Sequence, residues 1–316
     1  MSSSAPDFRP SATIAALAMR AELLRALRNF FYNEQFIEVE TPLVAGEIIP
    51  ELHIEPLQLK DGTFLQASPE LHMKRLLAAG ASAIFQVTRS FRADERGQLH
   101  NPEFTIVEWY RAGDGMLAGI DRLDALMQSL LGTPPSLRTT YAQAFERTLG
   151  ISPHTASMDD LIATTRREGI AVPEGLSEND HDSWLNLLLA VRVEPELGRD
   201  RPEIIYHYPA SQASLAKVEN SQLGYEVAER FELYYRGIEL ANGFHELGDA
   251  VELRKRFTAV NAARRATGRR ALPVPERLLA AMQHGLPDCT GVALGFDRLT
   301  MLATGEQTIN GVMAFP

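Results

Sequence analysis

Two short hydrophobic segments separated by a polar loop form the clearest pattern in the chain. Residues 84–91 are apolar and rich in strand-favouring residues, and residues 104–110 alternate with a period of two, which is typical of a half-buried strand. The loop between them has Gly97 at its tip, and Asn101 and Pro102 near its end. Because ordering a polar loop of this length costs entropy, we expect the loop to hold a ligand.

The rest of the chain alternates between helical and strand patterns. Residues 1–10 are predicted to be disordered, a helix capped by Ser11 is predicted to run to about Gln35, and a strand is predicted over residues 36–44. The pattern further predicts a strand that starts at Thr63, a helix over 71–79, a helical insertion over 115–200, a strand at 204–208, a hairpin over 231–246 turning near Arg236 and Gly237, and an exposed basic helix over 252–270.

The side chains of the polar loop suit a nucleotide. Arg92 offers a planar guanidinium for a phosphate, and His100 can donate to a second phosphate. Asp94 and Glu95 can accept from an exocyclic amine, and Phe104 offers a stacking surface. An ordinary charged hairpin is the alternative interpretation of this segment.

A second segment, residues 291–302, strengthens the nucleotide interpretation. Gly291 and Gly295 allow close backbone approach, and Arg298 stands at the start of an apolar helical run. A helix N-terminus and a guanidinium together attract anions. Because the phosphate-binding pattern Gly-x-x-x-x-Gly-Lys-Ser/Thr is absent from the sequence, we expect side chains to hold any nucleotide.

Three glutamates, Glu232, Glu239 and Glu246, come from the predicted hairpin. Strand alternation places Glu232 and Tyr234 on one face. Burying a carboxylate in an apolar strand without a partner is costly, so a cation is expected beside these glutamates. Exposed carboxylates on an edge strand are the alternative.

Composition narrows the class of protein. The chain has 316 residues, 45% of them hydrophobic, and a net charge of −10, which argues against a general nucleic-acid binder. We find no apolar run of the length of a membrane span and no leader pattern at the start, and the single cysteine, Cys289, fits a reducing cytoplasm. A soluble cytoplasmic protein is therefore expected.

These segments resemble the motifs of class II aminoacyl-tRNA synthetases, in particular lysyl-tRNA synthetases. Residues 36–42 are similar to motif 1, residues 91–110 to motif 2 and residues 291–302 to motif 3, and the resemblance runs from about Met19 to Met313. Residues 211–215 and 237–247 resemble, within this family, the free-standing paralogues that attach (R)-β-lysine to translation elongation factor P.

The resemblance implies a fold, cofactors and partners. It implies an α+β catalytic core over residues 1–316, with an antiparallel β-sheet of about six strands flanked by helices and no anticodon-binding domain. It also implies ATP and Mg²⁺ as cofactors, (R)-β-lysine as substrate and elongation factor P as acceptor. A homodimer formed through the first helix and strand is expected, whereas tRNA and a membrane are not.

The same resemblance implies roles for individual residues. Arg92 and Arg298 are the expected catalytic residues, and Glu232 and Glu239 the expected Mg²⁺ ligands. The expected ATP-binding residues are Arg92, Ala93, Asp94, His100, Asn101, Phe104, Glu239, Leu240, Gly295 and Arg298. The expected substrate-binding residues are Ser68, Pro69, Glu70, Tyr110, Asn242 and Glu246. Adenine is expected between Phe104 and Arg298, with Asp94 near its amino group.

Two positions depart from lysyl-tRNA synthetases. These enzymes usually have Asn-Glu where this chain has Ala93-Asp94, so the adenine contact can pass to Glu95. They have glycine where this chain has Ala293, whose methyl group is expected to disfavour an α-amino substrate. Two other functions stay open: activation of a lysine-type amino acid for another acceptor, such as a tRNA acceptor stem, and a sensor of ATP or amino acid.

Overall fold

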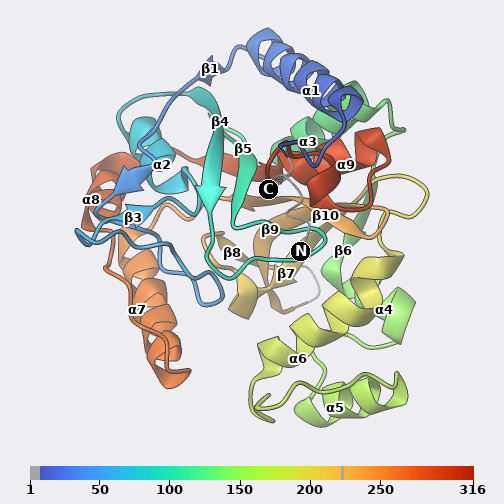
Figure 1. Cartoon of the computed structure of the whole chain (residues 1–316). Helices are drawn as coiled ribbons and strands as arrows, with labels where there is room; N and C mark the ends of the chain where they lie inside the picture. The colour runs from blue at the N-terminus through green and yellow to red at the C-terminus, as the bar shows by residue number, and fades with distance from the viewer. Residues whose placement is uncertain (1–7, 222–223) are drawn as a thin grey trace, which may run out of the picture.

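A large mixed sheet forms the centre of the molecule (Figure 1). The structure is a computed structural model and describes residues 8–221 and 224–316. In these residues the main sheet has nine strands in the order β1-β4-β5-β11-β10-β9-β7-β6, with β8 paired to β9. Its strands are β1 (Ile37–Glu38), β4 (Ala83–Phe91), β5 (Glu103–Ala112), β6 (Leu137–Thr140), β7 (Glu203–Pro209), β8 (Val218–Asn220), β9 (Glu226–Tyr235), β10 (Ile238–His245) and β11 (Cys289–Gly295).

The predicted antiparallel sheet is confirmed in the middle and wrong at the edges. The six strands from β4 to β7 in the sheet order pair antiparallel, whereas β1 pairs parallel with β4 and β6 pairs parallel with β7. Parallel neighbours need a long crossover, and both connections are long here. A separate small sheet pairs β2 (Val44–Ala45) with β3 (Phe64–Leu65).

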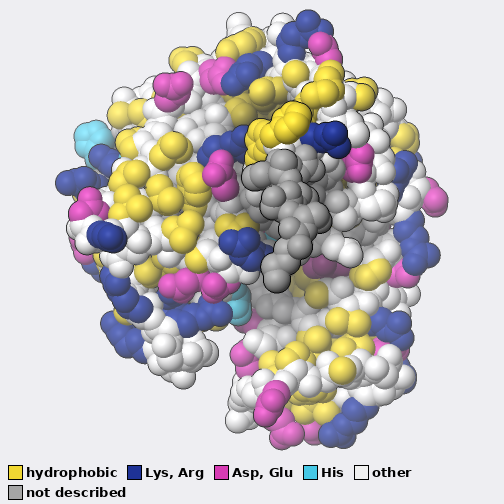
Figure 2. Space-filling model, viewed as in Figure 1, with side chains coloured by type: hydrophobic (Ala, Val, Ile, Leu, Met, Phe, Trp, Pro, Cys, Tyr) yellow, Lys and Arg dark blue, Asp and Glu magenta, His cyan; other side chains and the backbone are white. Residues whose placement is uncertain are grey.

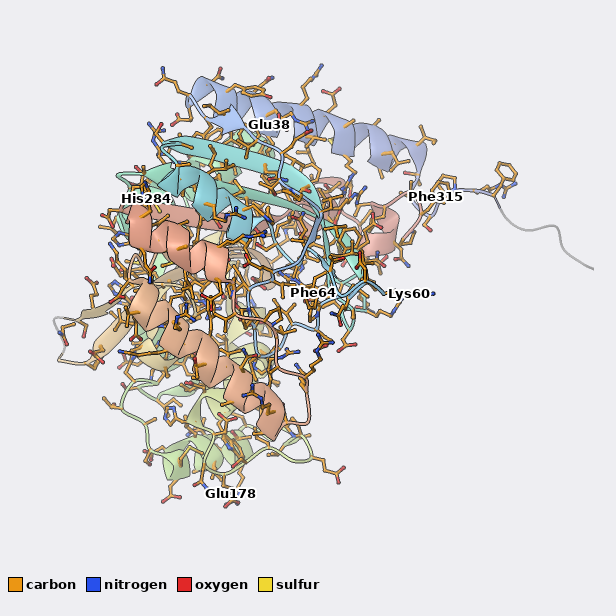
Figure 3. All side chains as sticks on the ribbon, turned by 90° about the vertical axis from the view of Figure 1, so that its left-hand side faces the viewer. Glu38, Lys60, Phe64, Glu178, His284 and Phe315 are labelled. Atoms are coloured by element: carbon orange, nitrogen blue, oxygen red, sulfur yellow. The ribbon has the colours of Figure 1, made fainter. Side chains whose placement is uncertain are left out.

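The helices cover both faces of the sheet. They are α1 (Ile14–Asn33), α2 (Glu70–Ala78), α3 (Met116–Leu131), α4 (Tyr141–Leu149), α5 (Met158–Arg167), α6 (His181–Leu188), α7 (Ala250–Ala266), α8 (Glu276–Gly285) and α9 (Phe296–Thr304). One face of the sheet packs against α1, α3 and α9, where Phe31 stacks on Phe85 with ring centroids 4.7 Å apart. Figure 3 shows α7 and α8 together on the opposite side.

Several predicted boundaries are wrong in detail. The first helix begins at Ile14, because Thr13 and not Ser11 accepts from the backbone of Ala16. The strand predicted over 36–44 forms only as the two short strands β1 and β2. The predicted helical insertion contains β6, which is extended because it pairs with β7.

The segment predicted as an exposed basic helix is buried along one face. Leu253, Phe257 and Arg264 of α7 are buried, whereas its outer face keeps exposed Arg and Lys side chains. Figure 2 shows this basic surface at the lower left of the molecule, over α7. Arg264 donates to the backbone carbonyls of Glu51 and Ile54 and pairs with Glu55 at 2.7 Å, so α7 anchors the loop that precedes β3.

The sheet order brings the chemical motifs together. The turn at Arg236 and Gly237, with φ of 53° and 71°, joins β9 to β10 as predicted, and β10 pairs with β11, which pairs with β5. The polar loop before β5 and the Gly291–Gly295 segment therefore lie side by side. No helix in the described residues is long and apolar enough to span a membrane.

Candidate active site

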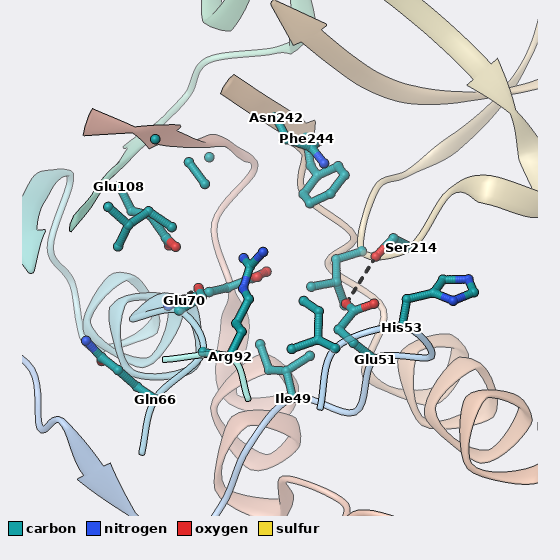
Figure 4. Close-up of a pocket in the computed structure, with 18 of the residues that line it drawn as sticks. Ile49, Glu51, His53, Gln66, Glu70, Arg92, Glu108, Ser214, Asn242 and Phe244 are labelled. Atoms are coloured by element: carbon teal, nitrogen blue, oxygen red, sulfur yellow. Dashed lines mark hydrogen bonds between the residues drawn. The ribbon is translucent and has the colours of Figure 1, made fainter. Parts of the chain in front are cut away.

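A pocket of about 710 Å³ opens over β5, β10 and β11, and is bounded by α2, α7 and the loop of residues 45–54 (Figure 4). The predicted site residues that line it are Ser68, Glu70, Arg92, His100, Asn101, Phe104, Tyr110, Glu239, Leu240, Asn242, Glu246, Gly295 and Arg298. Pro69, Ala93, Asp94 and Glu232 lie outside its lining. The fold thus gathers residues from four distant segments of the chain in one cavity.

One end of the pocket, here named the carboxylate end, holds Glu70, Glu108, Tyr110 and Glu246. The Tyr110 hydroxyl donates to the Glu108 carboxylate at 3.2 Å. Burial, together with the charge of Glu70, raises the pKa of Glu108 to about 8. Burial likewise raises the pKa of Glu246 to about 7, although Lys74 opposes the rise. Carboxylates in this state gain most from a cationic ligand.

Glu108 was not among the predicted site residues, although strand alternation in β5 indicates it. Strand alternation places Phe104, Ile106, Glu108 and Tyr110 on one face of β5, and all four line the pocket. Glu108 also lies directly opposite Ala293 in the pairing of β5 with β11. The methyl group of Ala293 and the Glu108 carboxylate therefore border the same part of the cavity.

Position 291 requires glycine, because side chains of the carboxylate end lie directly against its backbone. A Cβ atom on Gly291 would lie 2.2 Å from the Tyr110 ring and 2.3 Å from the Glu246 carboxylate. Gly295 differs, because a Cβ there would have its nearest neighbour at 3.8 Å. The predicted close backbone approach is thus confirmed for Gly291, whereas Gly295 has room for a side chain.

Lys74 supplies a cation from within the protein. Its ammonium lies 2.6 Å from Glu70 Oε1 and 2.6 Å from Glu246 Oε2, and its side chain is 1% exposed. Glu70 and Lys74 are four residues apart on α2, so one helix face carries both. Glu246 therefore has a cationic partner within the protein, Lys74, which no sequence pattern marked. The substrate ammonium predicted beside Glu246 stays a prediction.

The other end of the pocket, here named the arginine end, contains Arg92, His100, Phe104 and Arg298. The Arg92 guanidinium stacks 5.0 Å above the Phe104 ring and binds Glu95 at 3.0 Å. Glu95 lines the pocket, whereas Asp94 is exposed outside it. The geometry therefore favours Glu95 over Asp94 as the carboxylate that a ligand meets.

Arg298 is held by neighbours on two other segments, the polar loop and β10. It donates to the Glu239 carbonyl at 2.9 Å and to the Glu239 carboxylate at 3.2 Å, and it contacts His100 Nε2 at 2.6 Å. Burial, and next the charge of Arg298, lower the pKa of His100. A neutral His100 can accept from Arg298 with one ring nitrogen and still donate with the other.

Glu232 is fully engaged by protein donors. Its carboxylate accepts from Tyr208 at 2.5 Å, from Tyr234 at 2.6 Å and from Arg230 at 2.5 Å. Burial, and then the charge of Glu232, raise the pKa of Glu239. In the described residues no group of three or more His, Cys, Asp or Glu side chains is arranged to hold a metal ion.

A further wall of the pocket comes from the loop of residues 45–54 and the start of the segment after β7. Glu51 faces Ser214, with the hydroxyl 3.4 Å from the carboxylate (Figure 4). Burial, and next the charge of Glu70, raise the pKa of Glu51 to about 7. Glu51 belongs to a loop without regular structure, so no sequence pattern marked it.

Comparisons with known proteins agree with the motifs. The sequence profile of "tRNA synthetases class II (D, K and N)" matches residues 2–316. The curated elongation factor P–(R)-β-lysine ligase of Pseudoalteromonas translucida (strain TAC 125) is 45% identical over 315 residues, which cover 97% of this chain and 96% of that protein. The ligases so named from Yersinia enterocolitica and Klebsiella pneumoniae (strain 342) are also 45% identical, over 98% of this chain and 97% of theirs.

These matches cover nearly the whole chain, and residues 91–110 and 291–302, the segments similar to motifs 2 and 3, both contribute to the lining of one pocket. They also agree with the α+β fold, in which an antiparallel core sheet carries the site. This chain belongs to the family of class II tRNA synthetases (D, K and N), together with the elongation factor P–(R)-β-lysine ligases.

Proposed function

We propose that this protein activates (R)-β-lysine with ATP and transfers it to a lysine side chain of elongation factor P. The observation that carries the proposal is the 45% identity, over 97–98% of the chain, to relatives named for this reaction. The pocket supports it, because an arginine end suited to a nucleotide adjoins a carboxylate end suited to an amine.

In the first step the substrate carboxylate attacks the α-phosphorus of ATP. A new P–O bond forms, the α–β phosphoanhydride bond breaks, and pyrophosphate leaves. Arg92 stabilises the charge that develops on the α-phosphate, and Arg298 with His100 binds the terminal phosphate. Both arginines hold exchangeable partners, Glu95 and Glu239, which phosphate oxygens can replace.

Recognition of the amino acid falls to the carboxylate end. Glu246, Glu108 and Tyr110 suit the distant amine of a lysine-type substrate, and Glu70 suits the amine nearer the carboxyl group. A substrate that lacks one amine leaves a buried carboxylate unpaired, which costs several kcal/mol (roughly 2–5). Lysine-type amino acids are therefore selected over monoamines.

ATP would bring Mg²⁺ to the arginine end. Glu239 lines the pocket there and keeps one oxygen free of Arg298, whereas Glu232 stands behind it in contact with Arg230, Tyr208 and Tyr234. Magnesium is commonly held by one or two carboxylates plus substrate phosphates, and these residues fit that arrangement. When bound, the ion would neutralise phosphate charge; Glu239 would hold it from the pocket wall, and Glu232 would join only after releasing one of its protein donors.

In the second step the neutral amine of the acceptor lysine attacks the carbonyl carbon of the adenylate. An amide bond forms, AMP leaves, and the amine loses a proton. The sequence shows no protein nucleophile pattern, and none is needed, because the adenylate is already an activated acyl group.

We also propose a homodimer through α1 and the segment after it. Large apolar side chains are exposed there, namely Ile14, Met19, Tyr32, Ile37, Leu43 and Val44. Several exposed apolar side chains on neighbouring segments of the chain are typical of a protein interface. Sedimentation equilibrium of the wild type and of an Ile37→Lys variant tests the assembly; a monomeric wild type contradicts it.

ATP–pyrophosphate exchange tests the activation step. Purified protein is assayed with (R)-β-lysine, L-lysine or no amino acid, and elongation factor P is then added and weighed by intact mass. Exchange that prefers (R)-β-lysine, followed by addition of one β-lysyl unit, is the expected result. Exchange without modification of the factor rejects this acceptor, and a lack of exchange with every amino acid favours a sensor.

A further inference from the structure

The lysine at the base of the carboxylate end is unusual for this chain. The sequence contains only four lysines, Lys60, Lys74, Lys217 and Lys255, and among the buried side chains that the structure describes the other cation, Arg264, is an arginine. Lys74 is the deeply buried one, at 1% exposure. Burying an ammonium ion is costly without close counter-charges, so its position calls for a reason.

Lys74 contacts one oxygen of each of two pocket carboxylates. Its ammonium takes Oε1 of Glu70 and Oε2 of Glu246, each at 2.6 Å. The second oxygen of each carboxylate is left for another partner. The Glu246 Oε1 atom is the one that lies beside Gly291, on the pocket side.

We infer that Lys74 is a positioning residue for the substrate: it holds Glu70 and Glu246 apart, ionised and correctly turned, so that their remaining oxygens receive the two amines of a diamino acid. This inference rests on the proposed function, which puts a lysine-type amino acid in this pocket. Lys74 itself does not touch the reacting atoms, and acts through the two carboxylates.

Charge balance supports this role. The carboxylate end has three glutamates, Glu70, Glu108 and Glu246, and Lys74 pairs with two of them, Glu70 and Glu246. The ammonium groups of a bound diamino acid add the further positive charge that favours the ionised form of these carboxylates. A compact ammonium can contact both carboxylates at once, whereas a guanidinium is broader and would fill the space that the substrate needs.

Without Lys74, the buried carboxylates would repel each other and one would take up a proton. The titratable groups around Glu246 are Lys74 and Glu70 on α2, Glu108 and Tyr110 on β5, Cys289 on β11 and His245 on its own strand. Of these, Lys74 contributes the largest effect that lowers the pKa of Glu246, and burial raises that pKa to about 7. Removing Lys74 therefore moves this pKa upward.

The test compares Lys74→Met and the neutral hydrogen-bonding variant Lys74→Gln with wild type in ATP–pyrophosphate exchange, at pH values from 6 to 9. We expect KM for (R)-β-lysine to rise about tenfold at pH 7, and the acidic limb of kcat/KM to move up by about one pH unit, because a one-unit pKa shift changes the ionised fraction about tenfold. KM for ATP should stay constant. Lys74→Arg should return the limb to its wild-type pH, with a higher KM.

An exposed lysine serves as the control for the Lys74 variants. Lys255→Met removes an exposed lysine of α7 and should change neither limb nor KM. If Lys74→Met only lowers the melting temperature and leaves the acidic limb in place, the inference is wrong and Lys74 is structural. A wild type that shows no amino-acid-dependent exchange contradicts the proposed function instead.

A measurement on the wild type covers the case in which the variants do not fold. With only four lysines, ¹⁵N-lysine labelling gives few side-chain signals to assign. We expect the Lys74 ammonium signal to move when (R)-β-lysine saturates the protein, while the Lys60 signal stays still. An unmoved Lys74 signal at saturation overturns the inference.

Discussion

The two ends of the pocket hold their charges in opposite surroundings. At the carboxylate end, the side chains of Lys74 and Glu246 are each 1% exposed. At the arginine end, those of Arg92 and Arg298 are 25% and 19% exposed, and their partners Glu95 and Glu239 are 30% and 38% exposed. Water partly compensates the charges at the arginine end. Fully buried charges need counter-charges from the protein before a ligand binds.

This difference suggests how each end selects its ligand. The arginine end can exchange its glutamate partners for phosphates, because phosphate oxygens are charged acceptors for Arg92 and Arg298 just as the carboxylates are. The carboxylate end is built around a fixed number of charges, so it discriminates by the number and position of amines. We therefore expect the arginine end to contribute binding strength and the carboxylate end to contribute specificity. Four substitutions test this expectation.

The largest effect is expected for Arg92→Ala. Losing a preorganised donor at a developing phosphate charge costs roughly 3–4 kcal/mol, about 10²–10³ in rate. Exchange should fall by that factor while the circular dichroism melt stays close to wild type, because Arg92 is partly exposed. Arg96→Ala, an exposed arginine of the same loop, is the matched control. Near wild-type exchange in the Arg92 variant removes it from the mechanism.

Glu246→Gln should have the next largest effect, confined to the amino acid. The change leaves Lys74 with Glu70 alone and removes the buried charge that the substrate amine requires. We expect kcat/KM for (R)-β-lysine to fall roughly 10²-fold, consistent with a lost buried charge pair, and KM for ATP to stay unchanged. Glu226→Gln, an exposed change on β9, serves as control. An equal loss for both substrates breaks the comparison between the two ends.

Sequence patterns predicted the elements that carry the site better than the strand that depends on pairing with a distant neighbour. The polar loop and the hairpin at Arg236 and Gly237 were predictable from local turn signals, and the glycine itself marked the close approach at Gly291. The edge strand β6 was not predictable: it is extended only because β7 lies beside it, and no local signal marks residues 137–140 as a strand.

The candidate site shows the same limit. Glu108 could have been found by extending the alternation that places Phe104 and Tyr110 on the same face of β5. Lys74 could not, since its ion pair with Glu246 joins α2 to the end of β10 across 172 positions of sequence, and only tertiary structure brings them to 2.6 Å. Long-range charge pairs leave no periodic trace in one sequence.

Ala293→Gly should shift substrate preference without abolishing activity. Ala293 lies opposite Glu108 on the neighbouring strand and lines the pocket, so loss of its methyl group opens space for an amine on the α carbon. One methyl group in a fitted pocket changes specificity by roughly 10–200-fold, and we expect the ratio of kcat/KM for L-lysine to that for (R)-β-lysine to rise about tenfold. Exchange with each amino acid measures that ratio, and an unchanged ratio excludes a role for this methyl group.

The smallest effect is expected for Asp94→Ala, although this residue stands in the motif position where lysyl-tRNA synthetases have glutamate. Asp94 is exposed outside the pocket, whereas Glu95 lines it and binds Arg92 at 3.0 Å. Exposed substitutions usually change free energy by about 0.5 kcal/mol or less, so exchange should stay within about twofold of wild type. Glu95→Ala, measured in parallel, should raise KM for ATP more than Asp94→Ala does. If the order is reversed, the adenine contact belongs to Asp94, and the loop must rearrange when ATP binds.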